Sequence, residues 1–340
     1  MKILVTGGTG YIGAHTVVEL QQNGHEVVII DNLSNSYPEV LLSIQKITGI
    51  QPVFEKIELC DPVQVDDFFR RNTGIDGVIH FAAFKAVGES AILPLKYYHN
   101  NLFSLINLLK GMQDNKINAF IFSSSCTVYG QPDHLPVDEL SPILPSSSPY
   151  GDTKQISEKI ISEQVKVTDL KTILLRYFNP IGAHESALIG ELPIGIPNNL
   201  VPFITQTAIG KRECLNVFGN DYATPDGTCI RDYIYVGDLA KAHVKALKRI
   251  LEKKNENSCE VFNLGTGNGF SVLEVINSFE RVSGVKLNYR FAPRREGDIV
   301  KIWSDCTLAN NVLGWKAEKD LDGMMLSAWN WEKHLAENFK

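Results

Sequence analysis

The sequence lacks long basic runs, long apolar runs and closely spaced cysteines, and each absence excludes a class of protein. A net charge of −6 without a basic cluster argues against a nucleic-acid or anionic-membrane partner. No apolar run approaches the roughly 20 residues that span a bilayer, so no membrane segment is expected. The six cysteines are scattered, with neither a C-x-x-C pair nor the His spacing of zinc sites. We therefore predict reduced thiols and no metal site.

The start of the chain and its overall composition favour a cytoplasmic globular protein. The opening "MKILVTGGTG" turns to glycine too early for a signal peptide, so we expect a cytoplasmic location. Hydrophobic residues make up 44% of the 340 residues and charged residues 21%, without a low-complexity segment. Such a chain can bury a large core, and it is long enough for an enzyme.

The first half alternates strand-like and helix-like segments. Apolar runs such as "KILVT", "EVVII", "DGVIHF", "AFIFSSS" and "KTILLRYFN" are separated by helical patterns, one of them ending near Met112. This alternation predicts an α/β fold with a Rossmann-type doubly wound parallel sheet and a smaller, less regular C-terminal substrate lobe. We place a dinucleotide-binding domain at 1–178 and the substrate lobe at 179–340. Parts of about 228–265 are candidates to rejoin the main sheet.

A glycine-rich turn follows the first predicted strand. Gly7, Gly10 and Gly13 in "VTGGTGYIG" let the backbone turn tightly, approach a pyrophosphate and present amides at a helix N-terminus. Asp31 ends the second strand eighteen residues after Gly13, where a carboxylate binds ribose hydroxyls and repels a 2′-phosphate. The sequence therefore predicts NAD rather than NADP. Further cofactor contacts are expected where later strands end, at Glu58, Leu59, Phe81, Ala82 and Ala83.

The stretch "SSSPYGDTK" places Tyr150 four residues before Lys154 at the start of a predicted helix. Ser147 or Ser148 can cap that helix, and Pro149 suits its first turn. The two side chains then lie one turn apart, where positive charge can make the phenolate accessible as a proton acceptor. Alternatively, they are an ordinary surface pair.

Two residues near the end of the preceding strand help to decide whether Tyr150 and Lys154 are catalytic or an ordinary surface pair. Ser125 is either a catalytic hydroxyl or a buried one bonded to backbone. The neighbouring Cys126 is a weaker candidate, as a nucleophile. A serine at a strand end combined with Tyr150 and Lys154 favours catalysis.

These features together resemble the extended short-chain dehydrogenase/reductase superfamily, and within it the family of UDP-glucose 4-epimerases. The segments that carry the resemblance run from one end of the chain to the other: "GGTGYIG", "DNLSNS", "HFAAFKAVGES", "YYHNN", "FSSSCTVYG", "SPYGDTK", "RYFNPIGAH", "PNNLVPFI", "GTCIRDYIYV", "NLGTG" and "RREGD". The resemblance implies reversible inversion at C4 of UDP-galactose and UDP-glucose through a 4-keto sugar, with tightly bound NAD as the internal hydride carrier, in galactose metabolism. It also implies a homodimer, formed by the helix before Met112 and the Tyr150 helix.

The resemblance also assigns roles to individual residues. Tyr150 would take the proton of the 4-hydroxyl, Lys154 would bind the nicotinamide ribose and lower the pKa of Tyr150, and Ser125 would hold the C4 oxygen. Further implied NAD contacts are Tyr11, Ile12, Asp31, Asn32, Glu58, Leu59, Phe81, Lys85, Asn100 and Phe178. The implied UDP-sugar contacts are Lys85, Asn179, Asn199, Leu200, Arg231, Arg295, Asp298 and Ile302.

Two departures from the family pattern leave alternatives open. Glu58 stands where the family more often has Asp, and Ile302 stands where it has either an aromatic or a small residue. Because a small residue there is associated with N-acetylated sugars, epimerisation of UDP-N-acetylhexosamines stays open. A nucleotide-sugar dehydratase or decarboxylase is disfavoured, since Cys126 and Thr127 occupy the place of a dehydratase's Asp-Glu pair. A non-catalytic dinucleotide sensor would not need Ser125, Tyr150 and Lys154.

Overall fold

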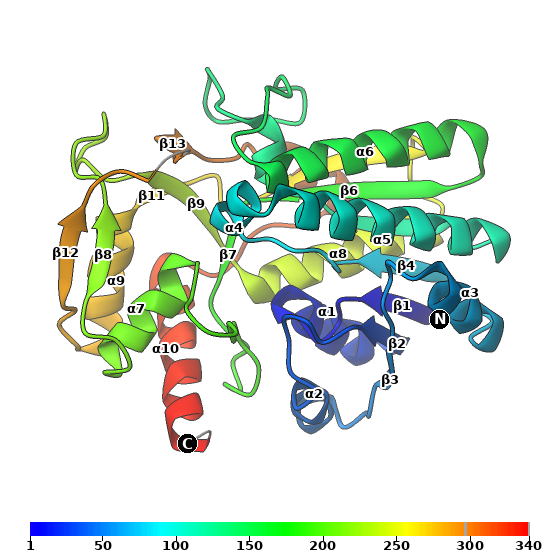
Figure 1. The fold of residues 1–340 in the computed structure, drawn as a ribbon, viewed down its shortest axis with the longest axis horizontal. Coiled ribbons are helices and arrows are strands. Elements are labelled where there is room, and N and C mark those ends of the chain that lie inside the picture. Colours follow the sequence, from blue (N-terminus) through cyan, green and yellow to red (C-terminus); the bar gives the residue numbers. More distant parts are fainter. Residues whose placement is uncertain (296–297, 339–340) are drawn as a thin grey trace.

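The structure, a computed structural model, describes residues 1–295 and 298–338. Its centre is a seven-stranded parallel sheet in the order β10-β6-β5-β4-β1-β2-β3 (Figure 1). The strands are β1 (Lys2–Thr6), β2 (Glu26–Asp31), β3 (Val53–Lys56), β4 (Gly77–His80), β5 (Ala119–Ser123), β6 (Lys171–Tyr177) and β10 (Cys259–Leu264). Chain direction across the sheet switches between β1 and β4, the place where such sheets bind ligands. The predicted Rossmann-type doubly wound sheet is confirmed.

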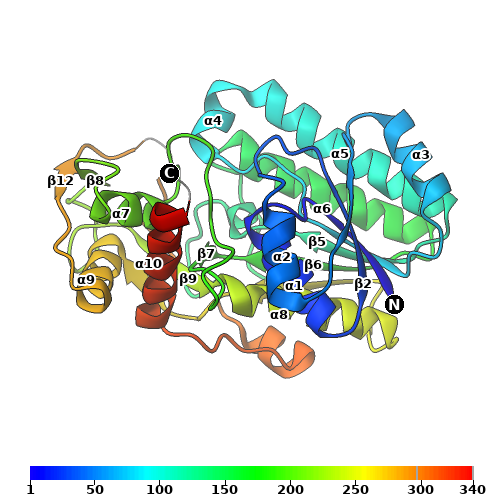
Figure 2. The ribbon, with the colours of Figure 1, turned by 90° about the horizontal axis from the view of Figure 1, so that it is seen from below.

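Helices cover both faces of this sheet, which explains why its strands are apolar throughout. One face carries α1 (Tyr11–Gln22), α2 (Val40–Thr48) and α8 (Val236–Leu251). The other carries α3 (Pro62–Arg71), α5 (Pro94–Asp114) and α6 (Pro149–Val167). Figure 2 shows α5 and α6 side by side across the sheet from α1 and α8. The short helix α4 (Val87–Ile92) precedes α5, and the 3-10 turn η1 (Cys126–Tyr129) follows β5.

The second lobe contains two small sheets and three long helices around its own core. One sheet joins β7 (Asn179–Ile181), β9 (Ile230–Tyr235), β11 (Gly269–Ser271) and β13 (Lys301–Ile302), and the other pairs β8 (Leu215–Phe218) with β12 (Tyr289–Ala292). The helices are α7 (Leu200–Ala208), α9 (Val272–Ser283) and α10 (Leu321–Asn338), whereas the π-helical turn η2 (Ala309–Leu313) packs against α8 and β10 in the core of the main sheet. Helices α7, α9 and α10 bury Ile204, Phe279 and Met325 against one another and the strands.

The chain returns from the second lobe to the first sheet through α8 and β10. Helix α8 packs against α1, and β10 pairs with β6 in parallel, with Asn263 beside Arg176. Both elements lie within 228–265. The division into domains at about residue 179 stays a prediction.

Candidate active site

The turn between β1 and α1 forms a backbone cradle that only glycine permits. Gly7 adopts φ +69°, and a Cβ there would lie 2.8 Å from the main-chain nitrogen of Ala82. A Cβ on Gly13 would strike the carbonyl oxygen of Gly7, so helix and turn approach as closely as their backbones allow. Gly10 caps α1 without a side-chain hydrogen bond, which leaves the first helical amides available to an anion. The cradle therefore fits a dinucleotide pyrophosphate.

Asp31 lies beside this cradle at the end of β2. Its carboxylate accepts hydrogen bonds from the amides of Thr9 (3.3 Å) and Leu33 (2.9 Å). Close by, the Asn32 amide donates to Glu58 at 2.8 Å, and the other oxygen of Glu58 accepts from the Cys60 amide at 3.0 Å. The longer carboxylate at residue 58 is thus held in place. The residues expected at the adenosine end lie together on the β2 and β3 side of the sheet.

The remaining predicted cofactor residues lie in the segments after β3, β4 and β6, in the first turn of α1 and in α5. The Ala82 amide donates to Thr6 in β1 at 3.3 Å, and Tyr11 in the first turn of α1 donates its hydroxyl to the Gly182 carbonyl at 2.6 Å. Asn100 bonds to Asn101, which in turn accepts from the Phe84 amide. Leu59 and Phe178 are buried, while Ile12, Phe81 and Ala83 are partly exposed.

Tyr150 and Lys154 are positioned by the start of α6. Ser148 caps that helix by accepting from the Gly151 amide, and Pro149 takes the first position, as expected. The Lys154 ammonium lies 6.0 Å from the centre of the Tyr150 ring and donates to the Ser123 carbonyl at 2.7 Å. The Ser125 side chain accepts from the Thr127 amide at 3.2 Å and faces the phenol. The three predicted catalytic residues therefore meet at the carboxyl ends of β5 and β6.

Burial dominates the electrostatics of this group. It raises the pKa of Tyr150 well above its usual value, with neighbouring Tyr177 adding to the rise and the Ser125 hydroxyl opposing it. Burial also lowers the pKa of Lys154 to about 8, against the attraction of Glu158. The ammonium alone therefore does not make phenolate accessible.

The surroundings of Cys126 disfavour a nucleophilic thiol. Burial raises the pKa of its thiol to about 12, although the charge of Arg231 opposes the rise. A thiol with such a pKa is protonated at neutral pH and reacts poorly. The weaker candidate of the sequence analysis is therefore set aside.

Apart from Lys85, which follows β4 in the first lobe, the further UDP-sugar contacts implied by the resemblance come from separate segments of the second lobe. Parallel pairing of β13 with β9 places Ile302 opposite Arg231. Asp298 accepts from Arg295 at 3.1 and 3.2 Å and lies 3.9 Å from Arg231. Asn179 begins β7, and Asn199 and Leu200 begin α7. Two residues of the "RREGD" segment, at 296 and 297, lie outside the described residues.

Glu191 and Phe218 contact predicted site residues, and the sequence alone did not single them out. The same oxygen of Glu191 accepts from Lys85 at 3.0 Å and from Asn199 at 2.6 Å, and thereby joins a predicted cofactor residue to a predicted substrate residue. The ring of Phe218 faces the Arg295 guanidinium, 5.0 Å from the ring centre. Glu191 stands in a loop of glycine and proline without a periodic pattern, so its sequence context carried no signal.

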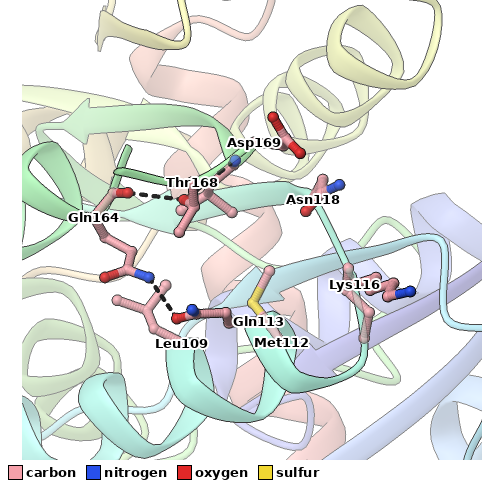
Figure 3. A pocket seen from close by; sticks show the side chains of 10 residues that line it. Leu109, Met112, Gln113, Lys116, Asn118, Gln164, Thr168 and Asp169 are labelled. Carbon is pink, nitrogen blue, oxygen red and sulfur yellow. Dashed lines mark hydrogen bonds between the residues drawn. The ribbon is translucent and has the colours of Figure 1, made fainter. Parts of the chain in front are cut away.

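A pocket elsewhere on the molecule lies between the last turns of α5 and α6 (Figure 3). In it Gln164 donates to Gln113 at 2.8 Å, and Thr168 bonds back to the Gln164 carbonyl. This pocket borders the beginnings of β5 and β6, whereas Ser125 and Tyr150 stand near their carboxyl ends. It is therefore separate from the candidate active site.

Across 1–295 and 298–338, every helix is too short or too polar to cross a bilayer. In the same ranges, no group of three or more His, Cys, Asp or Glu side chains is arranged to hold a metal ion.

A dinucleotide cradle facing a Ser-Tyr-Lys group, on a sheet wound in this order, defines a dinucleotide-dependent enzyme of the extended short-chain dehydrogenase/reductase superfamily. Residues 3–265 match the NAD dependent epimerase/dehydratase family. The chain belongs to this family. The match spans the whole main sheet, from β1 to β10.

Relatives of known function cover the full length of the chain. A UDP-glucose 4-epimerase of Bacillus subtilis is 49% identical over 100% of this chain and 99% of its own length. The UDP-glucose 4-epimerase of Stenotrophomonas maltophila, solved with NAD and formylated UDP-arabinopyranose, is 47% identical with a TM-score of 0.95, covering 99% of each chain. That of Bifidobacterium longum, solved with NAD+ and UDP, is 45% identical with a TM-score of 0.95, covering 100% of each chain.

Proposed function

We propose that this protein is an isomerase that interconverts UDP-galactose and UDP-glucose by inverting the sugar at C4. The observation that carries the proposal is the meeting of Ser125, Tyr150 and Lys154 beside the glycine cradle, in a chain whose relatives were solved with NAD and with UDP or a UDP-sugar. When bound, NAD supplies a reversible hydride acceptor, so that the sugar is oxidised at C4 and reduced again without an external redox partner.

The protein supplies the proton transfer and the alignment. Tyr150 accepts the proton of the 4-hydroxyl and returns it to the 4-keto oxygen, and the Ser125 hydroxyl holds that oxygen. The Lys154 ammonium lies 6.0 Å from the centre of the Tyr150 ring and stays fixed by the Ser123 carbonyl. It acts on Tyr150 through its positive charge and binds the ribose next to the nicotinamide.

The second lobe holds the nucleotide end of the substrate. Arg231 and Arg295 supply guanidinium groups for the pyrophosphate, and Asp298 is positioned between them to accept from uridine ribose hydroxyls. Asn179, Asn199 and Leu200 bind the sugar and the nucleotide. A 4-keto sugar tethered at its pyrophosphate can turn over and present its opposite face to the returning hydride.

We infer that the protein works as a homodimer through α5 and α6. Leu95, Phe103 and Ile106 lie along α5 and are 80%, 51% and 45% exposed. Figure 1 shows α5 and α6 as the outermost layer on their side of the sheet. A stripe of apolar side chains on an otherwise uncovered helix pair supports burial against a second copy.

The proposal is tested by incubating the purified protein with UDP-galactose without added cofactor and following the products by proton NMR. We expect UDP-glucose to appear up to a fixed ratio, without a 4-keto-6-deoxy product. If turnover starts only when NAD is added, the cofactor exchanges and the mechanism stands. If nothing happens even with NAD, the assignment of UDP-hexose as substrate is refuted.

A second candidate activity, on UDP-N-acetylhexosamines, is favoured by Ile302. This side chain is 2% exposed and packs with Val128 and Phe178, and it is smaller than an aromatic ring. A side chain smaller than an aromatic ring at this position supports acceptance of an N-acetyl group in the proposed sugar pocket. Incubation with UDP-N-acetylgalactosamine in the same NMR assay tests this second activity.

A further inference from the structure

A buried ion pair lies directly behind Lys154. Glu158, one turn further along α6, accepts from the Arg176 guanidinium at 3.0 and 2.7 Å. Their side chains are 10% and 8% exposed. Removing the two charges of an ion pair from water costs free energy that offsets much of the attraction between them. The net contribution to folding stability is therefore small, and stability alone does not explain the presence of this pair. Its place between the catalytic helix and β6 indicates another role.

The pair is bonded to Ser124, the residue before the predicted catalytic serine. The Ser124 hydroxyl donates to Glu158 at 2.5 Å. Ser124 stands between Ser123, whose carbonyl holds the Lys154 ammonium, and Ser125. Glu158 therefore joins the lysine-bearing turn of α6 to the segment that carries the serine.

Arg176 anchors the other side of the network. It donates to the Tyr129 hydroxyl at 3.1 Å, and Tyr129 donates to the Asn263 side chain at 2.6 Å. The network thus extends from α6 through β6 and η1 to β10. None of these three residues was predicted to touch NAD or substrate.

The other ionisable groups that face Tyr150 and Lys154 are neutral near pH 7. Burial lowers the pKa of His80 on β4 to about 3 and raises the pKa of Tyr97 on α5, Cys126 on η1 and Tyr177 on β6. The charged guanidinium of Arg231 on β9 acts on Cys126, where it opposes the rise of the thiol pKa. Among the described residues, Glu158 is the charged side chain whose field reaches the Lys154 ammonium.

We propose that Glu158 and Arg176 are positioning residues with two effects. They set the electrostatic potential at the Tyr150–Lys154 pair, and they hold Ser124 and Ser125 in place beside that pair. The proposal rests on the proposed function, in which Tyr150 moves the proton. The Glu158 carboxylate favours the protonated form of Lys154. The Arg176 guanidinium limits that negative field, which would otherwise hold the phenol protonated.

The two partners therefore have opposite effects on the pH dependence of turnover. The acidic limb of the kcat profile reports ionisation of Tyr150 in the substrate complex. On the acid side of the Lys154 pKa of about 8, where the ammonium stays protonated, Glu158→Gln leaves the Arg176 cation unbalanced and should move that limb about half a pH unit lower. Arg176→Met leaves the carboxylate unbalanced and should move it about as far upward. In both variants we expect kcat to fall while bound NAD and the KM for UDP-galactose change by less than about twofold.

A second bidentate pair in the same protein provides a matched control. Glu260 on β10 accepts from Arg249 on α8 at 2.7 and 2.9 Å, and the two side chains are 8% and 11% exposed. This pair lies toward the beginning of β10, away from Asn263. Glu260→Gln should lower stability without moving the acidic limb. The double variant Glu158→Gln/Arg176→Met, which leaves neither charge, should return the limb to its wild-type position.

The proposal is overturned if the two single variants are folded and their limbs shift in the same direction or not at all. If either single variant does not fold, Ser124→Ala and the double variant decide. Both should lower kcat without a limb shift, and wild-type kcat in both would refute the positioning role. An inactive wild-type protein would instead refute the proposed function. In that case the electrostatic potential at Tyr150 can be measured without turnover. The phenol is titrated through its phenolate absorbance, with Tyr150→Phe as the blank.

Discussion

The ammonium of Lys154 donates a 2.7 Å hydrogen bond to the main-chain carbonyl of Ser123, the last residue of β5. This contact joins the catalytic helix to the strand whose extension carries Ser125. It also fixes the positive charge 6.0 Å from the centre of the Tyr150 ring. The lysine therefore contributes its charge and its position to the proposed chemistry, while proton transfer belongs to the phenol.

Replacing Tyr150 by Phe should abolish turnover while leaving the protein folded and loaded with NAD. The ring still fills its buried place, but the group that accepts the proton is gone, so kcat should fall about 10²- to 10⁴-fold. The measurement is kcat by NMR together with the NAD content of the purified protein. Tyr235→Phe, which removes a buried hydroxyl bonded to Ala183 in the other lobe, should keep nearly full activity. Activity retained by Tyr150→Phe would contradict the assignment.

The folding stability contributed by residue 154 should depend on pH in a defined direction. Burial lowers the pKa of Lys154 from 10.5 to about 8, so the folded protein holds this proton less tightly than the unfolded chain. The cost of burying the ammonium is then full below pH 8 and disappears as pH rises toward 10.5. Relative to wild type, Lys154→Met should lose on the order of 2 kcal/mol of unfolding free energy between pH 7 and pH 10.

Urea unfolding of both proteins, freed of NAD, across this pH range measures that difference. A difference that stays constant with pH would show that the lysine titrates alike in the folded and unfolded chains. The same variant should lose turnover at every pH, because the positive charge next to Tyr150 is absent.

Local patterns predicted the first sheet and the catalytic helix well. Alternating apolar and helical periods, a capping serine and a proline lie within a few residues of one another, so they can be read directly from the chain. The β9–β13 pairing could not be predicted, because it joins Arg231 to Ile302 across seventy residues and β13 has only two residues. The pKa of Tyr150 depends on burial, which sequence spacing does not reveal.

We expect Asp232 to maintain the shape of the UDP-sugar side of the proposed site. Its buried carboxylate accepts five hydrogen bonds, two from Thr266, two from Ser304 and one from Gly267. Burial raises its pKa in spite of these donors. Asp232→Asn would turn an amide donor toward other donors and should cost about 2–3 kcal/mol.

Because Asp232 follows Arg231 and holds the strand of Ile302, the KM for UDP-galactose should rise in the same variant. Urea unfolding and steady-state kinetics check the two effects. The surface variant Asp67→Asn, which loses an exposed pair with Arg70, should match wild type in both. Unchanged stability of Asp232→Asn would mean that its carboxylate is protonated.

The proposed dimer predicts that charge on α5 separates the subunits. Phe103→Glu combined with Ile106→Glu places two carboxylates on the apolar stripe and should yield a monomer in sedimentation velocity experiments. Leu140→Glu is the control, because Leu140 is 92% exposed on a loop and should leave the dimer intact. A wild-type protein that sediments as a monomer, or a double variant that remains dimeric, would rule out this interface.

Enlarging residue 302 should narrow the range of sugars. Ile302 packs beside Val128 and Phe178, next to the segment that carries Ser125. Ile302→Tyr puts a bulkier side chain at this position of the proposed sugar pocket, so the kcat/KM for UDP-N-acetylgalactosamine should fall at least about tenfold relative to that for UDP-galactose. UDP-galactose serves as the internal control, because a misfolded pocket would lower both values together. Ile302→Ala should move the ratio in the opposite direction. If the wild-type protein turns over the N-acetylated substrate and Ile302→Tyr leaves that turnover unchanged, residue 302 does not limit the sugar pocket, and the selection must come from another wall of it.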